Sequence, residues 1–173
     1  MILRQARLGD APDICAIINA VIRDTTFTFT TKERSEADIA ADMALSWAGF
    51  QVAEQDGRVV GFATYAPFRS GPGYAHTKEL TIHLAAQARR RGTGRALMQT
   101  LEKVAIGQGV HALVGGISAS NPDGIAFHAA CGFTEVGRLP QVGFKSGQWL
   151  DLVLMQKILP VAIPGADSAA LSG

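Results

Sequence analysis

The stretch from Ala88 to Glu102, ARRRGTGRALMQTLE, combines three consecutive arginines, two glycines and a segment with helical spacing. The first N–H groups of a helix have no partner within it, and they carry a partial positive charge. Glycines allow an anion to approach the backbone closely, and arginines add charge-assisted hydrogen bonds. A strand, this loop and the following helix therefore predict a site for a phosphate or pyrophosphate group.

Two common nucleotide-binding motifs do not fit the same stretch. A P-loop requires a Lys-Ser or Lys-Thr pair after its glycines, and none follows Gly94 here. A dinucleotide-binding fingerprint requires a third small residue, but Leu97 occupies that position. Short arginine-glycine motifs also occur in solvated basic loops. The surrounding segments must therefore decide whether this stretch is a phosphate site or such a loop.

The composition limits the class of protein. The chain has 173 residues, 47% of them hydrophobic, which is enough for one domain with a buried core. A net charge of +1 argues against a nucleic-acid-binding protein, and no apolar run reaches the ~20 residues of a membrane span. Cys15 and Cys131 lie far apart in apolar segments, which predicts buried thiols rather than a metal site or disulfide. We expect a cytoplasmic protein with neither nucleic acid nor membrane as a partner.

The apolar periodicity predicts strands and helices in a mixed order. Helices are expected after Asp10 and over residues 35–48, 92–108 and 121–131. Strands are expected over residues 1–7, 50–68, 77–86, 110–118 and 133–159, and the ranges 50–68 and 133–159 are each expected to contain two strands. Ser35 and Asp38 have the spacing of a capping box, and Asp56-Gly57 predicts a hairpin turn. This order predicts a mixed α/β fold, with one domain over 1–158 and a poorly ordered tail over 159–173.

Arg89-x-x-Gly92-x-Gly94, between a strand and a helix, resembles the acetyl-CoA loop of the GNAT N-acetyltransferase superfamily. Longer stretches resemble its phosphinothricin/methionine sulfoximine (sulfone) acetyltransferase branch: TTFTFTTKE, YAPFRSGPGYAHTKELTIHL, ISASNPDGIAFHAACGF and RLPQVGFKSGQWLDLVLMQ. The resemblance covers the chain up to about residue 158. It implies a mixed, mostly antiparallel central sheet flanked by helices, acetyl-CoA as cosubstrate, no metal, a small-molecule amine as acceptor, and a homodimer.

The resemblance also implies which residues bind the cofactor. The pantetheine arm would pair, like an added strand, with the strand that contains Ile82, His83 and Leu84. The pyrophosphate would bind the loop and its amides, which belong to Arg89, Arg90, Arg91, Gly92, Thr93, Gly94 and Arg95. Asn121 matches an asparagine of the branch, although an Asn-Pro pair is also a common start of a turn.

Acetyl transfer requires an unprotonated amine, a polarised thioester carbonyl and a leaving thiolate. The resemblance implies that Glu79 is the general base; the alternative is a surface glutamate paired with Lys78. His128 would protonate the thiolate or form a hydrogen bond near it, and the alternative is a histidine packed on a short helix. The backbone N–H near Leu84 would polarise the carbonyl.

The acceptor site follows from the same resemblance. Arg69 matches an arginine of the branch and would pair bidentately with a carboxylate or phosphinate of the acceptor. Phe29 and Tyr74 would wall the pocket, with core packing as the alternative for Phe29. Three positions depart from the branch: Ala75 and Lys78 bear on the choice of acceptor, and Gly124 bears on one cofactor hydrogen bond.

Three functions remain open from the sequence. The first is N-acetylation of a small amino acid-like amine such as phosphinothricin, methionine sulfoximine or methionine sulfone. The second is acetylation of another amine, such as a polyamine or a protein N-terminus. The third is a non-catalytic acyl-CoA-binding sensor, against which the presence of Glu79 weighs.

Overall fold

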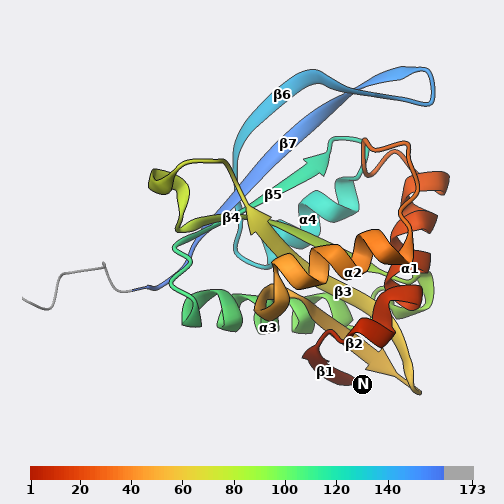
Figure 1. The fold of residues 1–173 in the computed structure, drawn as a ribbon. Coiled ribbons are helices and arrows are strands. Elements are labelled where there is room, and N and C mark those ends of the chain that lie inside the picture. The colour runs from red at the N-terminus through yellow and green to blue at the C-terminus, as the bar shows by residue number, and fades with distance from the viewer. Residues whose placement is uncertain (162–173) are drawn as a thin grey trace, which may run out of the picture.

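The computed structural model describes residues 1–161, which form a twisted sheet with helices on both faces (Figure 1). In this part of the chain the sheet has 7 strands in the order β1-β2-β3-β4-β5-β7-β6. The strands are β1 (Ile2–Gln5), β2 (Gln51–Gln55), β3 (Arg58–Pro67), β4 (Thr77–Leu84), β5 (Ala112–Ser118), β6 (Thr134–Lys145) and β7 (Gln148–Ile158). The helices are α1 (Ala11–Asp24), α2 (Glu36–Leu45), α3 (Thr93–Gly107) and α4 (Pro122–Ala130). The predicted mixed α/β class is confirmed.

Strands β4 and β5 run parallel, whereas the other neighbouring strands of this sheet pair antiparallel. The parallel ladder joins only Thr77–Leu80 to Ala112–Gly115. Because β4 continues to Leu84 and β5 to Ser118, the two strands part beyond this ladder. The far end of β4 therefore keeps backbone donors and acceptors on its β5 side for another partner.

The two faces of the sheet carry different helices (Figure 1). Residues of α1 and α2, such as Ile14 and Met43, pack in one core cluster. Residues of α3, such as Leu97 and Leu101, pack in a second cluster, and α4 contributes Phe127 to its edge. Successive side chains of a strand point to opposite faces of the sheet. Each residue of β4 or β5 therefore faces either α1 and α2 or α3 and α4.

Local sequence signals account for two of the element ends. The Ser35 hydroxyl accepts the Asp38 N–H at 3.1 Å, and the Asp38 carboxylate accepts the Ser35 N–H at 2.9 Å. This confirms the predicted capping box at the start of α2. Asp56 and Gly57 have φ values of 52° and 77° and form the predicted turn between β2 and β3.

The end of β7 bears on the predicted tail. Leu159 is buried in the core, and its N–H donates to the carbonyl oxygen of His111 at 2.7 Å. Ordered packing thus extends past residue 158, and residues 162–173 of the predicted tail lie outside the described part of the chain. No helix within residues 1–161 has the length and apolar character needed to span a membrane.

Candidate active site

The loop between β4 and α3 contains two glycines with different roles. Gly92 has a φ of 80°, a left-handed conformation that suits glycine, and α3 begins at the next residue. A Cβ at Gly94 would lie 3.1 Å from the Phe127 ring and 3.3 Å from Leu84. Gly92 therefore allows the turn, and Gly94 allows α3, β4 and α4 to approach one another closely.

The start of α3 is positively charged. Its first turn contains no acidic residue that would neutralise the helix dipole. Four exposed arginines surround it: Arg89, Arg90, Arg91 and Arg95. Arg90 lies 3.5 Å from Asp123 of α4, but both side chains are more than 80% exposed, at 88% and 86%, so this pair holds the guanidinium only weakly. The loop can therefore bind a phosphate group without first breaking a strong ion pair.

Ile82, His83 and Leu84 lie on the end of β4 that has parted from β5. The His83 ring packs against Phe62, with 5.6 Å between the ring centroids. Burial, with a smaller contribution from the charge of Arg89, lowers the pKa of His83 to about 4, so the ring is neutral at pH 7. The side chain of His83 thus packs against the sheet, while its backbone remains at the opening.

Asn121 caps α4. Its side-chain oxygen accepts the Gly124 N–H at 3.0 Å, which satisfies one of the unpaired donors of the first turn. A Cβ at Gly124 would lie 2.8 Å from the Asn121 Cγ, so a serine at this position would displace the cap. Glycine at position 124, where the sequence departs from the branch, therefore allows the observed conformation of Asn121. The role of Asn121 toward the cofactor stays a prediction.

Glu79 is exposed and lies beside the place where β4 and β5 part. Its Oε1 atom lies 3.3 Å from where a Cβ of Gly116 would be, so the carboxylate lies over bare backbone of β5. Lys78 lies on the opposite face of β4, where it lines a hollow of about 210 Å³ with Tyr65 and Gln108. No ion pair formed within residues 1–161 includes Glu79, so the alternative pairing with Lys78 is not observed.

His128 occupies the other face of β5, against the preceding glycine. A Cβ at Gly115 would lie 3.2 Å from its Nε2 atom. Its Nδ1 atom lies 2.8 Å from the Gly124 carbonyl oxygen, which assigns the hydrogen to Nδ1. Burial lowers the pKa of His128, and the rings of Phe127 and Phe133 meet it edge-on. The imidazole is thus neutral and packed, and its role toward a thiolate stays a prediction.

Arg69 and Tyr74 lie in the loop before β4. The Arg69 guanidinium lies 5.2 Å from the centre of the Phe68 ring, and the Phe68 and Tyr74 rings are 6.2 Å apart. The Phe68 N–H donates to the Thr77 carbonyl oxygen at 3.4 Å, which holds this group beside the start of β4. Both predicted acceptor residues therefore lie at the end of β4 that carries Glu79, and both are exposed.

The segment between α1 and α2 is attached to the end of β5. The Thr26 hydroxyl lies 2.8 Å from the Ser120 hydroxyl, which lies 2.8 Å from the Ser118 hydroxyl. Ser118 shares a face of β5 with Gly116, because residues two apart in a strand point the same way. This segment, which carries the predicted residue Phe29, therefore covers the face of β5 on which Glu79 lies.

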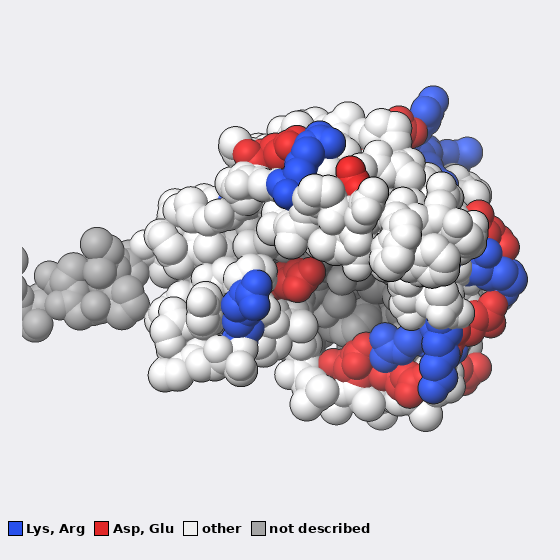
Figure 2. Space-filling view, turned by 90° about the horizontal axis from the view of Figure 1, so that it is seen from above, with Lys and Arg blue, Asp and Glu red and all other residues white. Residues whose placement is uncertain are grey.

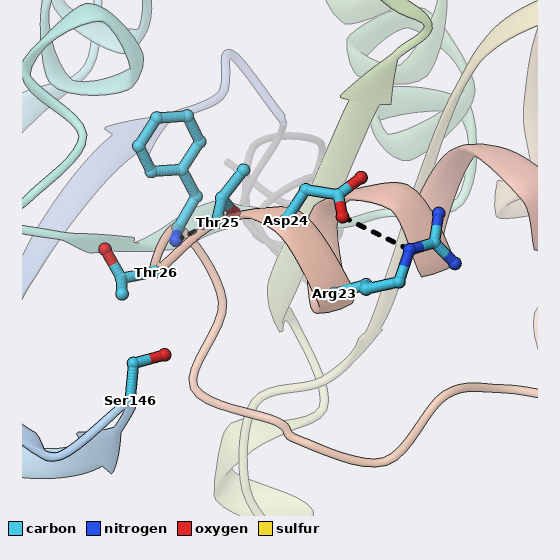
Figure 3. A pocket seen from close by; sticks show the side chains of 6 residues that line it. Arg23, Asp24, Thr25, Thr26 and Ser146 are labelled. Atoms are coloured by element: carbon cyan, nitrogen blue, oxygen red, sulfur yellow. Dashed lines mark hydrogen bonds and ion pairs between the residues drawn. The ribbon is translucent and has the colours of Figure 1, made fainter.

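A surface hollow of about 340 Å³ lies beside the same segment (Figure 3). It is lined by Arg23, Asp24, Thr25, Thr26 and Phe27, and by Ser146 from the turn between β6 and β7. Figure 3 shows Ser146 across from Thr26, so the hollow separates the hairpin turn from the segment after α1. Its volume is at the lower end of the range for small-molecule sites.

The described side chains and one face of the surface were compared with the features of metal and nucleic-acid sites. Within residues 1–161 no group of three or more His, Cys, Asp or Glu side chains is arranged to hold a metal ion. On the face drawn in Figure 2, acidic and basic side chains lie in mixed groups separated by uncharged surface. A continuous basic stripe, which nucleic-acid binding requires, does not cross that face.

A comparison with models of protein families identifies the family of this chain. The model of the acetyltransferase (GNAT) family matches residues 16–133, which include β4, the arginine-glycine loop and α4. The chain belongs to the GNAT acetyltransferase family. The non-catalytic sensor is therefore set aside, and the binding of the cosubstrate's phosphates by the arginine-glycine loop stays a prediction.

Relatives of this acetyltransferase carry the names of the predicted branch. The L-methionine sulfoximine/L-methionine sulfone acetyltransferase of Pseudomonas paraeruginosa is 34% identical over 161 residues, which are 89% of this chain and 92% of the relative. The phosphinothricin N-acetyltransferase of Alcaligenes faecalis is 35% identical over 161 residues, which are 91% of this chain and 82% of the relative. The recognition made from the sequence motifs is confirmed.

Solved structures agree with the fold and the cofactor. A GNAT superfamily phosphinothricin acetyltransferase from Sinorhizobium meliloti, in complex with acetyl-CoA, is 31% identical with a TM-score of 0.85, over 91% of this chain and 88% of that chain. A ribosomal-protein-alanine N-acetyltransferase from Brucella melitensis is 39% identical with a TM-score of 0.85, over 92% of this chain and 100% of that chain. The predicted GNAT-type sheet and the use of acetyl-CoA are confirmed.

The residues of this acetyltransferase fit acetyl-CoA at the opening between β4 and β5. The parted end of β4 would offer backbone groups to the pantetheine arm, and the start of α3 would offer positive charge to the pyrophosphate. No atom lies within 4 Å of a Cβ added at Gly92, so the approach to the helix start is open there. The predicted cofactor residues are thus brought together, although they come from a strand, a loop and two helices.

Sequence reasoning missed the glycines of β5 and the serines that follow them. Gly115 and Gly116 leave room for His128 and Glu79 on opposite faces. A glycine pair inside an apolar strand is a signal of close approach by another group, and this signal was present in VGGIS. The hydroxyl contact of Ser120 with Thr26 had no such signal, because it joins segments far apart in the chain.

Proposed function

We propose that this enzyme transfers an acetyl group from acetyl-CoA to the amine of a small amino acid-like acceptor of the phosphinothricin, methionine sulfoximine or methionine sulfone type. Relatives with these names support the acceptor class, because they align with 89% and 91% of this chain. The observation that carries the proposal is the exposed Glu79 carboxylate over Gly116, beside the parting of β4 and β5.

Glu79 acts as the general base in this proposal. A typical α-amino group has a pKa of ~7.7–8.0, so the ammonium form must lose a proton before the nitrogen can attack. The Glu79 carboxylate is exposed and takes part in no ion pair formed within residues 1–161. It can therefore accept this proton directly or through one water molecule.

Backbone and histidine groups serve the other half of the reaction. When bound, acetyl-CoA supplies an activated acetyl thioester. We assign the polarisation of its carbonyl to the backbone N–H near Leu84, on the part of β4 without a β5 partner. His128, whose Nδ1 hydrogen is held by Gly124, offers only the Nε2 lone pair, so we assign it hydrogen bonding and packing near the thiol rather than proton donation.

Acceptor recognition is assigned to the loop before β4 and to the segment after α1. The Arg69 guanidinium is exposed and can pair bidentately with the carboxylate or phosphinate of the acceptor. Tyr74 and Phe29 form the walls. Lys78 lies on the opposite face of β4, so its departure from the branch leaves the acceptor side unchanged.

The Glu79→Gln variant tests the base. We expect kcat for an amino acid-like acceptor to fall by about 10²- to 10⁴-fold, because the amide cannot accept the proton. The Kd for acetyl-CoA, measured by calorimetry, should stay unchanged. Glu135→Gln is the matched control, since Glu135 is an exposed strand glutamate whose ion pair within residues 1–161 is with nearby Arg138. Full turnover by Glu79→Gln would remove the base assignment.

A protein N-terminus is the second candidate acceptor. The observation in its favour is the 39% identity to the ribosomal-protein-alanine N-acetyltransferase from Brucella melitensis. Polyamines remain a further alternative amine. A short peptide with a free N-terminal alanine and a polyamine, each offered beside methionine sulfone, separate these candidates by the rate of thiol release.

The homodimer and the cytoplasmic location that were expected from the sequence remain part of the proposal. Exposed Phe144 and Trp149 on the hairpin of β6 and β7, with ring centroids 4.9 Å apart, support an interface between two copies. Light scattering of the purified protein tests the dimer. A monomer mass at micromolar concentration would contradict it.

A further inference from the structure

The segment of residues 25–30, between α1 and α2, is here called the acceptor loop. On one side it meets β6. A Cβ at Gly143 would lie 2.6 Å from the Cγ atom of Phe29, so the Phe29 ring lies directly on the backbone of β6. Gly143 is buried and has no positive φ, so its glycine identity is explained by this close approach rather than by its backbone conformation.

Lys145 makes a second contact between β6 and the acceptor loop. Only 6% of this lysine is exposed, and its Nζ donates to the Thr28 carbonyl oxygen at 3.0 Å. No carboxylate within residues 1–161 pairs with it, and burial lowers its pKa. A lysine is rarely buried in this way without a partner, so holding the Thr28 carbonyl is the role that its surroundings support.

The acceptor loop, Glu79 and the contact residues of β6 share one face of the sheet. Gly116 and Ser118 of β5 face the side of Glu79, and Ser118 pairs with Leu152 of β7. Two residues before Leu152, Leu150 pairs with Gly143, so Gly143 lies on this face as well. The acceptor loop is thus held between Ser120, just after β5, and the hairpin of β6 and β7 (Figure 1).

We propose that Gly143 and Lys145 are positioning residues for the acceptor. They hold Phe29 and the acceptor loop against the face that carries Glu79, and thereby set the width of the pocket for the acceptor side chain. The inference rests on the proposed function, since it assigns the acceptor to this face. Substitutions at either position should change the use of the acceptor and leave the binding of acetyl-CoA unchanged, because the cofactor residues lie on β4, α3 and α4.

Gly143→Ala is the first test. A methyl group there displaces Phe29, so the KM for methionine sulfone, or for the best acceptor found, should rise about tenfold or more, with the KM for acetyl-CoA within about twofold of the wild-type value. Gly137→Ala is the matched control, because Gly137 lies on the same strand with no atom within 4 Å of its added Cβ. An unchanged acceptor KM, or an equal rise in both KM values, would overturn the proposal.

A double-mutant cycle keeps the test independent of general destabilisation. If Gly143→Ala acts by displacing Phe29, it should have no further effect on the acceptor KM in a Phe29→Ala background. The same fold-change in both backgrounds would contradict the proposed role of Gly143.

Lys145→Met should raise the acceptor KM in the same way, with the exposed Lys103→Met as its control. No rise in Lys145→Met would remove Lys145 from the proposal.

Amide hydrogen exchange separates this inference from the proposed function. Residues 25–30 should exchange faster in Gly143→Ala than in the wild-type protein or in Gly137→Ala, whatever the acceptor is. If no amino acid-like amine is acetylated and exchange in this loop is faster, the proposed function fails while the positioning contact stands. Equal exchange in all three proteins would overturn the positioning contact itself.

Discussion

The proposed site has a cofactor half and an acceptor half, which are built in different ways. The cofactor half consists mainly of one continuous stretch, from Ile82 to Arg95, in which a strand edge is followed by a turn and a helix start. The acceptor half joins the loop around Arg69, Glu79, the end of β5, the acceptor loop and the hairpin of β6 and β7. The first half depends on local backbone conformation, and the second depends on contacts between distant segments.

This difference predicts that the two halves respond separately to substitution. Changes near α3 should weaken the binding of acetyl-CoA, whatever the acceptor. Changes around Glu79 should affect turnover or acceptor affinity and leave the cofactor affinity unchanged. A variant that altered both affinities equally would show that the halves are coupled.

Gly94→Val should have the largest effect on the cofactor half. Its Cβ would already lie 3.1 Å from Phe127, and two further methyl groups would push α3 away from β4 and α4. We expect the Kd for acetyl-CoA to rise by about 100-fold or more, with a cost of about 1–3 kcal/mol in the free energy of unfolding. Gly107→Val, at the open end of the same helix, is the control. Wild-type affinity in Gly94→Val would show that the close approach is dispensable.

The combined Arg89→Gln, Arg90→Gln and Arg91→Gln variant tests the charge of the same half. Hydrogen bonds to charged groups contribute about 1.5–3 kcal/mol each, so the KM for acetyl-CoA should rise at least about tenfold. S-acetyl-pantetheine, which lacks the pyrophosphate, should be used equally by the variant and the wild-type enzyme. An equal loss with both donors would mean that the arginines act on the fold and not on the phosphates.

Gly116→Ala tests the acceptor half of the site with a smaller structural change. The added Cβ would lie 3.3 Å from the Glu79 Oε1 and 3.5 Å from Leu152, so the exposed carboxylate must shift by a few tenths of an ångström. We expect kcat to fall about threefold to tenfold while the Kd for acetyl-CoA is unchanged. Gly137→Ala is again the matched control. An unchanged kcat would place the base elsewhere.

The turn at Gly92 and the helix start after it could be predicted from the sequence because their signals are local, and their role toward the cofactor stays a prediction. Gly92, the arginines and the start of α3 lie within a few residues of one another, so the turn and the charged helix start follow from one short stretch. Glu79 was assigned as the base only through the family resemblance, and this assignment stays a prediction. The packing of Phe29 on Gly143 and the burial of Lys145 were not predicted, because the register of β6 and β7 against the acceptor loop is set by tertiary packing.

His83→Phe should have the smallest effect on activity, but it changes the response to acid. The pKa of His83 is about 4 in the folded protein and about 6.5 in the unfolded chain. Between pH 6.5 and pH 4, the unfolded chain therefore binds a proton at His83 that the folded protein does not bind. The free energy of unfolding of the wild-type protein should therefore fall by up to about 3 kcal/mol more than that of the variant from pH 7 to pH 4. Urea titrations at both pH values measure the difference. Parallel losses would contradict a buried, neutral His83.

The most direct test of the central claim is the release of CoA thiol from acetyl-CoA across a panel of amines. The panel contains phosphinothricin, methionine sulfoximine, methionine sulfone, ordinary amino acids, polyamines and a short peptide with a free N-terminus. We predict rapid release with one or more of the first three, together with a stoichiometric N-acetylated product. Release only with the peptide or a polyamine would keep the fold and the cofactor half, and would contradict the proposed acceptor half.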